Sequence, residues 1–180
     1  MMNRTIRPLA STDIAALQAI DELQHGQVWS QRMFQAEIDD PQRIHLVAER
    51  AGDIVGHAAA WIDGSSCRVT NVAVAQEHSG HGHGSALLLS LTRAVLEGHR
   101  VSNMQLEVRP TNRRAQRLYG RFGFMPVGVE REFYDRSDDR GSRDAVVMAV
   151  PDVCAEPWRT RLDKIETDSA DMTNETGAVA

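Results

Sequence analysis

Two adjoining segments, Val69-Thr-Asn-Val-Ala-Val74 and Gln76-Glu-His-Ser-Gly-His-Gly-His-Gly84, decide how this 180-residue chain folds. The first is rich in β-branched residues and predicts a strand. The second carries glycine at positions 80, 82 and 84, and an apolar stretch from Ser85 that predicts a helix follows it. Glycines ahead of a helix gather unpaired backbone N–H groups at the positive end of the helix dipole. The pattern therefore predicts a phosphate-binding loop.

This loop differs from two common phosphate-binding motifs. It lacks the Gly-Lys-Ser/Thr ending of the ATP-binding P-loop. Its glycine spacing also departs from the G-x-G-x-x-G pattern of dinucleotide-binding folds. The loop alone therefore does not identify the phosphate, and the rest of the chain has to do so.

The composition is that of one globular domain. Hydrophobic residues make up 42% of the chain and charged residues 25%, which is ordinary for a soluble protein. The formal charge is −5, and residues 151–180 hold seven acids and three bases, so a net charge of −1 is left for residues 1–150. A nearly neutral body argues against direct, sequence-independent binding of nucleic acid. Cys67 and Cys154 are too few for a disulfide framework or a zinc site. Without an apolar leader or membrane span, we expect a cytoplasmic protein that makes no membrane contact.

Hydrophobic periodicity predicts the element order β-α-α-β-β-β-α-β-α-β-β. The expected strands are residues 5–9, 44–50, 54–62, 67–74, 103–108, 124–132 and 145–150, and the expected helices begin near Thr12, Ser30, Ser85 and Arg113. Short turns between the second, third and fourth strands favour an antiparallel meander, and the helix after the glycines favours a βαβ crossover. The expected fold is therefore a mixed α/β (α+β) domain over residues 1–150, with a six- to seven-stranded sheet and about four helices on both faces. Residues 151–180 are expected to form an acidic, disordered tail.

The motifs, in this order, resemble those of the GNAT N-acetyltransferase superfamily. The resemblance rests on the two opening helices, the Thr-Asn-Val-Ala-Val strand, the loop Ser79–Gly84, Leu106-Glu-Val-Arg109, Asn112, Ala115, Leu118-Tyr119 and Phe122-Gly-Phe124. Within the superfamily the chain is most similar to the RimI-type ribosomal-protein-alanine N-acetyltransferases, through Val28-Trp-Ser30, Leu-Glu-Val-Arg109 and Asp144-Ala-Val-Val-Met148. The resemblance covers residues 4–150 and implies the GNAT fold.

The resemblance implies that the glycine-rich loop binds acetyl-CoA, with no metal ion. The residues expected to bind this cosubstrate are Val72, Ala73, Val74, Ser79, Gly80, His81, Gly82, His83, Gly84 and Asn112. In the family pattern R/Q-x-x-G-x-G/A, Gly82 and Gly84 match, but Ser79 stands where Arg or Gln is usual. Backbone amides supply most of such binding, so we expect the cosubstrate to bind despite this departure. Asn112 is also a good helix N-cap by residue type.

Two further residues are candidates for acid–base chemistry. Glu107 lies between Leu106 and Val108 on a strand, so its side chain points to the opposite face. By residue type it is a solvated carboxylate or one paired with Arg109, whereas the resemblance implies a general base. Tyr119 by type is a core residue, whereas the resemblance implies the acid that protonates the departing CoA thiolate. A carboxylate acting through water suits a protein α-amine, whose pKa is roughly 7.7–8.0 against about 10.4 for lysine.

Trp29, Phe133 and Tyr134 are the expected walls of an acceptor groove. The family usually carries Phe-Pro before this tryptophan, where this chain has His25-Gly26. The resemblance implies acetylation of a protein N-terminus, in particular that of a small-subunit ribosomal protein beginning with alanine. We expect a monomer or weak dimer. Two alternatives stay open, namely a GNAT enzyme acting on a small-molecule amine or a lysine side chain, and a non-catalytic acyl-CoA-binding module.

Histidine and arginine are concentrated near the predicted phosphate site. His78, His81 and His83 invite comparison with a metal site, but zinc favours fixed ligands on ordered elements and these lie at variable loop positions. Four arginines follow Asn112 on one predicted helix, at positions 113, 114, 117 and 121. In a nearly neutral domain they are expected to form a solvated helix face near the CoA 3′-phosphate rather than a nucleic-acid patch.

Overall fold

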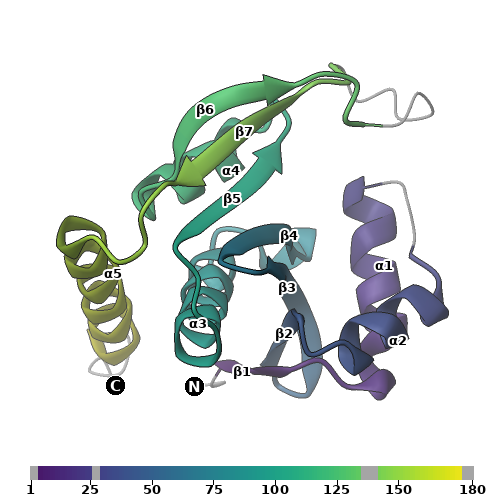
Figure 1. The fold of residues 1–180 in the computed structure, drawn as a ribbon. Helices are drawn as coiled ribbons and strands as arrows, with labels where there is room; N and C mark the ends of the chain where they lie inside the picture. Colours follow the sequence, from purple (N-terminus) through teal and green to yellow (C-terminus); the bar gives the residue numbers. More distant parts are fainter. Residues whose placement is uncertain (1–3, 26–28, 135–141, 176–180) are drawn as a thin grey trace.

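The structure is a computed structural model that describes residues 4–25, 29–134 and 142–175. Within these ranges, helices lie on both faces of one mixed seven-stranded sheet (Figure 1). The strands are β1 (Arg4–Pro8), β2 (Arg43–Arg50), β3 (Asp53–Asp63), β4 (Ser66–Val74), β5 (Asn103–Val108), β6 (Met125–Glu130) and β7 (Ala145–Val150). The helices are α1 (Ile14–His25), α2 (Gln31–Asp39), α3 (His83–Gly98), α4 (Arg113–Arg121) and α5 (Glu156–Glu175), with short 3-10 turns η1 (Ser11–Asp13) and η2 (Gln76–His78). The predicted mixed α/β class is confirmed.

The sheet order β1-β2-β3-β4-β5-β7-β6 combines an antiparallel meander with one parallel step. Strands β1 to β4 pair antiparallel, and short turns join β2 to β3 and β3 to β4. Strand β5 then pairs parallel to β4, because α3 returns the chain to the same end of the sheet. Strands β7 and β6 complete the sheet antiparallel. The parallel step therefore lies at the glycine-rich loop.

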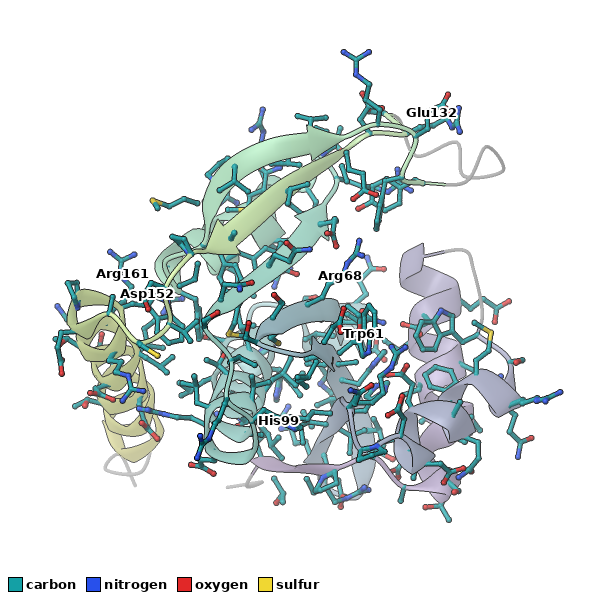
Figure 2. The ribbon with its side chains drawn as sticks, in the orientation of Figure 1. Trp61, Arg68, His99, Glu132, Asp152 and Arg161 are labelled. Carbon is teal, nitrogen blue, oxygen red and sulfur yellow. The ribbon has the colours of Figure 1, made fainter. Side chains whose placement is uncertain are left out.

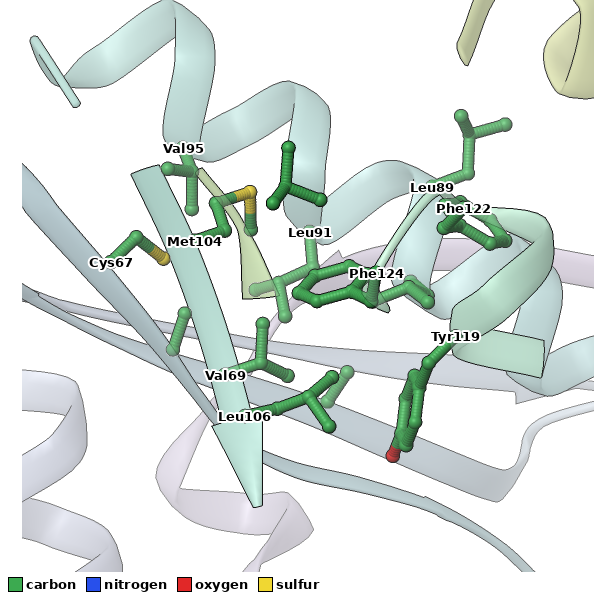
Figure 3. Packing of buried hydrophobic residues seen from close by; sticks show 14 of the residues in the cluster. Cys67, Val69, Leu89, Leu91, Val95, Met104, Leu106, Tyr119, Phe122 and Phe124 are labelled. Carbon is green, nitrogen blue, oxygen red and sulfur yellow. The ribbon is translucent and has the colours of Figure 1, made fainter. Parts of the chain in front are cut away.

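Helices cover both faces of the sheet. Helices α1 and α2 contact β2, β3 and β4 on one face, and α3 packs against the same strands on the other (Figure 1). Alternate residues of β4 and β5 are fully buried toward α3, namely Cys67, Val69, Met104 and Leu106, and they meet Leu91 and Val95 of that helix (Figure 3). The residues between them, including Arg68 and Glu107, consequently project from the opposite face.

The C-terminal segment forms a helix, so the expectation of a disordered tail is wrong for Glu156–Glu175. Trp158, Leu162 and Ile165 recur at helical spacing and are buried in the main core. The Trp158 indole Nε1–H also donates to the carbonyl oxygen of Phe122 at 2.8 Å. Three apolar residues in an otherwise polar helix are a narrow stripe, which is why composition favoured a solvated tail. The packed core therefore continues past residue 150.

A chain of buried polar groups lies between the α1–α2 layer and the sheet. Asp21 Oδ1 lies 3.0 Å from His57 Nε2, and His57 Nδ1 lies 3.0 Å from His45 Nε2. His45 Nδ1 faces Glu37 Oε2 at 3.8 Å. Glu37 Oε2 and His45 Nδ1 have no hydrogen-bond partner among the described residues. Burial raises the pKa of Glu37, and the Arg43 guanidinium, with Nη1 3.0 Å from Glu37 Oε1, opposes that shift.

Candidate functional site

The site forms where β4 and β5 separate. Their backbone pairing covers Ser66–Val69 against Asn103–Leu106 and then ends. At the same point the β3–β4 register shifts, so that one extra residue of β4, Thr70, forms a bulge. A bulge bends and twists its strand, so β4 turns away from β5. After this divergence, the last residues of β4 face α3 and α4 instead of a neighbouring strand.

A groove of about 560 Å³ occupies this position. Val72 and Val74 of β4 form its floor, and Leu118 and Tyr119 of α4 form one wall. The size is within the usual range for sites that enclose a small molecule. Its far end is lined by the glycine-rich loop and the start of α3.

The glycine-rich loop has the backbone conformation that a phosphate-binding loop requires. Gly80 and Gly82 adopt φ values of 88° and 77°, which favour glycine, and a Cβ at either would meet no atom within 4 Å. Gly82 is the N-cap of α3 and offers no side-chain cap. The backbone N–H groups of the first helical turn therefore remain available at the positive end of the helix dipole. This arrangement suits a diphosphate.

Two side chains at the start of α3 each have a buried polar atom that makes no hydrogen bond within the described part of the chain. His83 Nδ1 and Ser85 Oγ are buried and have no hydrogen-bond partner among the residues described. Burial lowers the pKa of His83 to about 4, with further lowering by Arg4 and His78 among its neighbours, so the ring is neutral near pH 7. Buried polar atoms without partners are costly, and a bound ligand that hydrogen-bonds them removes the cost. The residues present therefore fit a phosphate-bearing cosubstrate.

Helix α4 brings positive charge and a capped N-terminus to the groove. Arg114, Arg117 and Arg121 recur on one helix face, and all three line the groove. Asn112 also lines it and is the N-cap of α4, where its Oδ1 accepts from the Ala115 N–H at 3.0 Å. The predicted cap is therefore confirmed. Three of the four arginines expected on this face therefore lie along the groove, and Arg113 is not among the lining residues.

Tyr119 places a phenol between the groove and the core. Its ring packs beside Phe124, with the centroids 6.1 Å apart, while its hydroxyl points away from the packed cluster (Figure 3). Burial raises the pKa of Tyr119 well above its ordinary value, and Tyr134 contributes to the shift. The hydroxyl consequently holds its proton across the physiological range, as a proton donor requires.

Glu107 lies on the opposite face of β5, and its partner is Arg68. The Arg68 Nε–H donates to Glu107 Oε2 at 2.8 Å, and the Glu107 side chain is only 5% exposed. The expectation of a pair with Arg109 is wrong. The Arg109 guanidinium instead lies 3.6 Å from the centre of the Tyr134 ring.

Most predicted cosubstrate residues meet at the groove, and two stand apart. Those that line it are Val72, Val74, Ser79, Gly80, Gly82, His83, Gly84 and Asn112. His81 is exposed and is not among the lining residues, and its Nδ1 lies 3.3 Å from the His78 carbonyl oxygen. Ala73 is buried with Ile20 on the α1 side, so only its backbone faces the groove region. Alternation along β4 explains why Ala73 differs from its two neighbours.

The acceptor candidates fall into two clusters. Phe133 and Tyr134 make an edge-to-face pair with ring centroids 4.9 Å apart, after the end of β6. Trp29 packs against Phe34 at 5.5 Å in the α1–α2 layer. The side chain of His25 and the whole of Gly26, which the sequence analysis named beside Trp29, lie outside the described part of the chain. The two clusters project from the Glu107 side of the sheet.

The histidines and acids form no metal cluster within the described ranges. No group of three or more His, Cys, Asp or Glu side chains there could hold an ion. His83 instead makes ring contacts with His78 and His81, at centroid distances of 6.1 and 6.4 Å. In the same part of the chain, no helix is both long and apolar enough to cross a membrane.

Sequence reasoning missed Arg68 and the buried histidines. Arg68 carries a detectable signal, because it alternates with the apolar residues Cys67 and Val69 and so shares a sheet face with Glu107. His45 and His57 lie within apolar strand segments, where a polar residue indicates a buried partner. The identity of that partner, Asp21 on α1, depends on tertiary packing and has no local signal.

This fold and groove define an acyltransferase. The profile of the acetyltransferase (GNAT) family matches residues 14–124, and the chain belongs to this family. Its members transfer acetyl from acetyl-CoA, and the groove fits that cosubstrate.

Comparison with individual known proteins shows which members of the family this chain resembles. The chain is 31% identical over 147 residues to a ribosomal protein bS18-alanine N-acetyltransferase from Escherichia coli, covering 82% of this chain and 97% of the relative. It is 27% identical to an N-alpha-acetyltransferase from Sulfurisphaera tokodaii, over 81% of this chain and 92% of that one. The crystal structure of the ribosomal-protein-S18-alanine N-acetyltransferase from Escherichia coli superposes with a TM-score of 0.74 at 27% identity, covering 85% and 96% of the two chains. The predicted likeness to RimI-type enzymes is confirmed.

Proposed function

We propose that this protein acetylates the N-terminal α-amine of a protein, and that its substrate is a small-subunit ribosomal protein that begins with alanine. The observation that carries the proposal is the divergence of β4 from β5, with Tyr119 on the groove side and Glu107 on the other. An extended cosubstrate in the groove can present its thioester between the two strands, where an acceptor reaches it from the Glu107 side. The printed activities of the relatives support the same acceptor.

The chain holds acetyl-CoA through three groups of atoms. Amides of the loop from Ser79 to Gly84 and of the first turn of α3 bind the diphosphate. The arginine face of α4 binds the 3′-phosphate. Backbone groups of Val72, Ala73 and Val74 pair with the pantetheine arm and polarise the thioester carbonyl. When bound, acetyl-CoA supplies an activated acetyl group, and the protein supplies orientation and proton transfer.

Glu107 and Tyr119 manage the protons. An α-ammonium must lose a proton before it can attack, and Glu107 accepts that proton through an ordered water. Its pKa of roughly 7.7–8.0 makes an α-amine easier to deprotonate than a lysine side chain at about 10.4. Tyr119 donates its phenolic proton to the departing thiolate. Phe133 and Tyr134 line the approach to Glu107 and contact the acceptor's first residues.

A mass-spectrometric competition assay tests this function. The protein is incubated with acetyl-CoA and an alanine-started peptide that also contains one lysine, and fragmentation locates the acetyl group. We expect acetylation of the α-amine alone, and none of a control peptide whose N-terminus is already blocked. Acetylation of lysine, of a polyamine or of an amino sugar without α-amine turnover would contradict the proposal. Calorimetric binding of acetyl-CoA with no transfer to any of these amines would favour a non-catalytic module.

A further inference from the structure

Glu107 lies just beyond the end of the β4–β5 ladder, so it forms no backbone pair with β4. The last pair of the β4–β5 ladder joins Val69 to Leu106, and Glu107 is the next residue along β5. On its other side Glu107 pairs with Val147 of β7. Only a side-chain contact can therefore fix the carboxylate relative to β4, the strand that floors the cosubstrate groove.

Arg68 makes that contact and is itself held by three side chains. Its Nε–H donates to Glu107 Oε2 of β5 at 2.8 Å, and its Nη2 lies 3.8 Å from Glu130 Oε2 of β6. Its guanidinium carbon lies 5.7 Å from the centre of the Phe133 ring. Figure 2 shows Arg68 projecting from β4 toward β5 and the β6–β7 strand pair. One side chain thus joins the two halves of the sheet at the point where their ladder ends.

We propose that Arg68 is a positioning residue for acetyl transfer, which holds Glu107 so that one carboxylate oxygen is fixed and the other is free to take a proton. This inference rests on the proposed role of Glu107 as the base. The ion pair occupies Oε2, and among the described residues no donor contacts Oε1. A carboxylate held through one oxygen keeps a defined direction for the second, and small errors in such directions are costly for rate.

Burial makes the pair more than a surface ion pair. The Glu107 side chain is 5% exposed and that of Arg68 is 33% exposed. A largely buried carboxylate without a partner is unstable, so loss of Arg68 forces the Glu107 side chain to move. A planar guanidinium can donate from Nε while its face lies on an aromatic ring, whereas a lysine ammonium cannot do both. The geometry therefore specifies arginine rather than positive charge alone.

Substitution at Arg68 tests the proposal against a matched control. Arg93 has similar exposure, 32%, and two acidic partners, Asp163 and Glu166, but it lies between α3 and α5. We expect Arg68→Gln to lower kcat for the alanine-started peptide on the order of 10- to 100-fold, with an unchanged Kd for acetyl-CoA. Arg68→Lys should recover only part of the loss. Arg93→Gln should keep the wild-type kcat, because any effect there is on stability alone.

A double-mutant cycle with Glu107→Gln separates this inference from the proposed function. If both hold, Glu107→Gln lowers kcat, and adding Arg68→Gln lowers it no further, because the group that Arg68 positions is already lost. Wild-type kcat for Arg68→Gln, together with a large loss for Glu107→Gln, would overturn the role of Arg68 and leave the base in place. Wild-type kcat for Glu107→Gln would instead overturn the base. A full rescue by Arg68→Lys would contradict the requirement for a planar guanidinium.

Discussion

At the scale of single residues, the two candidate acid–base groups occupy opposite environments. Tyr119 is buried beside Phe124, and burial raises its pKa, so it keeps its proton. Glu107 is also largely buried, but a guanidinium compensates its charge. A protonated phenol on one side of β5 and a charge-paired carboxylate on the other suit a donor and an acceptor of protons respectively.

Replacing Tyr119 by phenylalanine should remove the proton donor while keeping the ring in its packed position. We expect kcat to fall about 100-fold, within the usual contribution of a positioned acid, and the Kd for acetyl-CoA to stay the same. Steady-state kinetics with calorimetry measure both quantities. A kcat within about twofold of wild type would show that the phenol only packs.

The partner of Glu107 illustrates what residue patterns predict and what they omit. Strand alternation correctly puts Glu107 on the face opposite Leu106, and it also puts Arg109 there. Arg68 is paired with Gln105 in the β4–β5 ladder, so it reaches Glu107 diagonally, a spacing of about 7–8 Å that a long side chain can span. Arg109, two residues along the same strand, lies nearly 7 Å away, and its guanidinium lies over the Tyr134 ring instead. Identifying Arg68 as the partner requires the β4–β5 register, which no local pattern contains.

At the scale of elements, the loop before α3 is the part that sequence predicts best. Glycine positions, the helix start and the N-cap Asn112 of α4 are local features, and all appear in the structure. The C-terminal helix α5 is the opposite case. Its stability depends on contacts with Phe122 and Gly123 at the end of α4, so its own polar sequence does not reveal it.

The loop conformation makes a testable claim about Gly82. Its φ of 77° disfavours any residue with a Cβ, so Gly82→Ala should shift the loop and raise the Kd for acetyl-CoA several-fold. The control is Gly52→Ala, at a φ of 92° in the β2–β3 turn, which carries a similar backbone penalty far from the groove. Calorimetry on both variants decides the claim. An equal rise in Kd for the two variants would mean that the loop conformation is unimportant for binding.

Docking of α5 can be tested through Trp158. Its truncation to alanine removes buried surface and the hydrogen bond to Phe122, so we expect a loss of about 3 kcal/mol in the free energy of unfolding. Arg159→Ala changes an exposed residue of the same helix and should cost less than about 0.5 kcal/mol. Denaturant titration measures both variants. Equal stabilities would indicate that α5 does not pack in solution as described.

At the scale of the whole molecule, buried histidines link folding to pH. Burial is the largest cause of the lowered pKa of two histidines, which falls to about 3 for His45 and to about 4 for His83. Both rings are therefore neutral in the folded protein over a range in which an unfolded histidine, with a pKa near 6.5, binds a proton. These neutral rings therefore stabilise the fold above about pH 6.5, and this stabilisation is lost as the pH falls from there toward the pKa values of the folded protein.

Acid should consequently destabilise the fold below about pH 6.5. The ion pair of Asp13 with Arg7 acts in the same direction, since it lowers the pKa of Asp13, while the raised pKa of Glu37 opposes it. Each histidine adds a slope of at most about 1.4 kcal/mol per pH unit. Denaturant titrations at several pH values should show this fall, and His83→Gln should reduce its slope. A free energy of unfolding that is constant down to about pH 5 would contradict the buried, neutral histidines.

The central claim is that Glu107 activates a protein α-amine for attack on acetyl-CoA bound beside it. The most direct measurement is kcat/KM of Glu107→Gln for an alanine-started peptide from about pH 6 to pH 9, with Glu49→Gln, an ion-paired carboxylate of β2, as the matched control. The structure predicts a loss of about 100-fold or more near neutral pH for Glu107→Gln, lessening as the amine deprotonates unaided at higher pH, and a small change for Glu49→Gln. Wild-type kcat/KM for Glu107→Gln throughout this range would contradict the account.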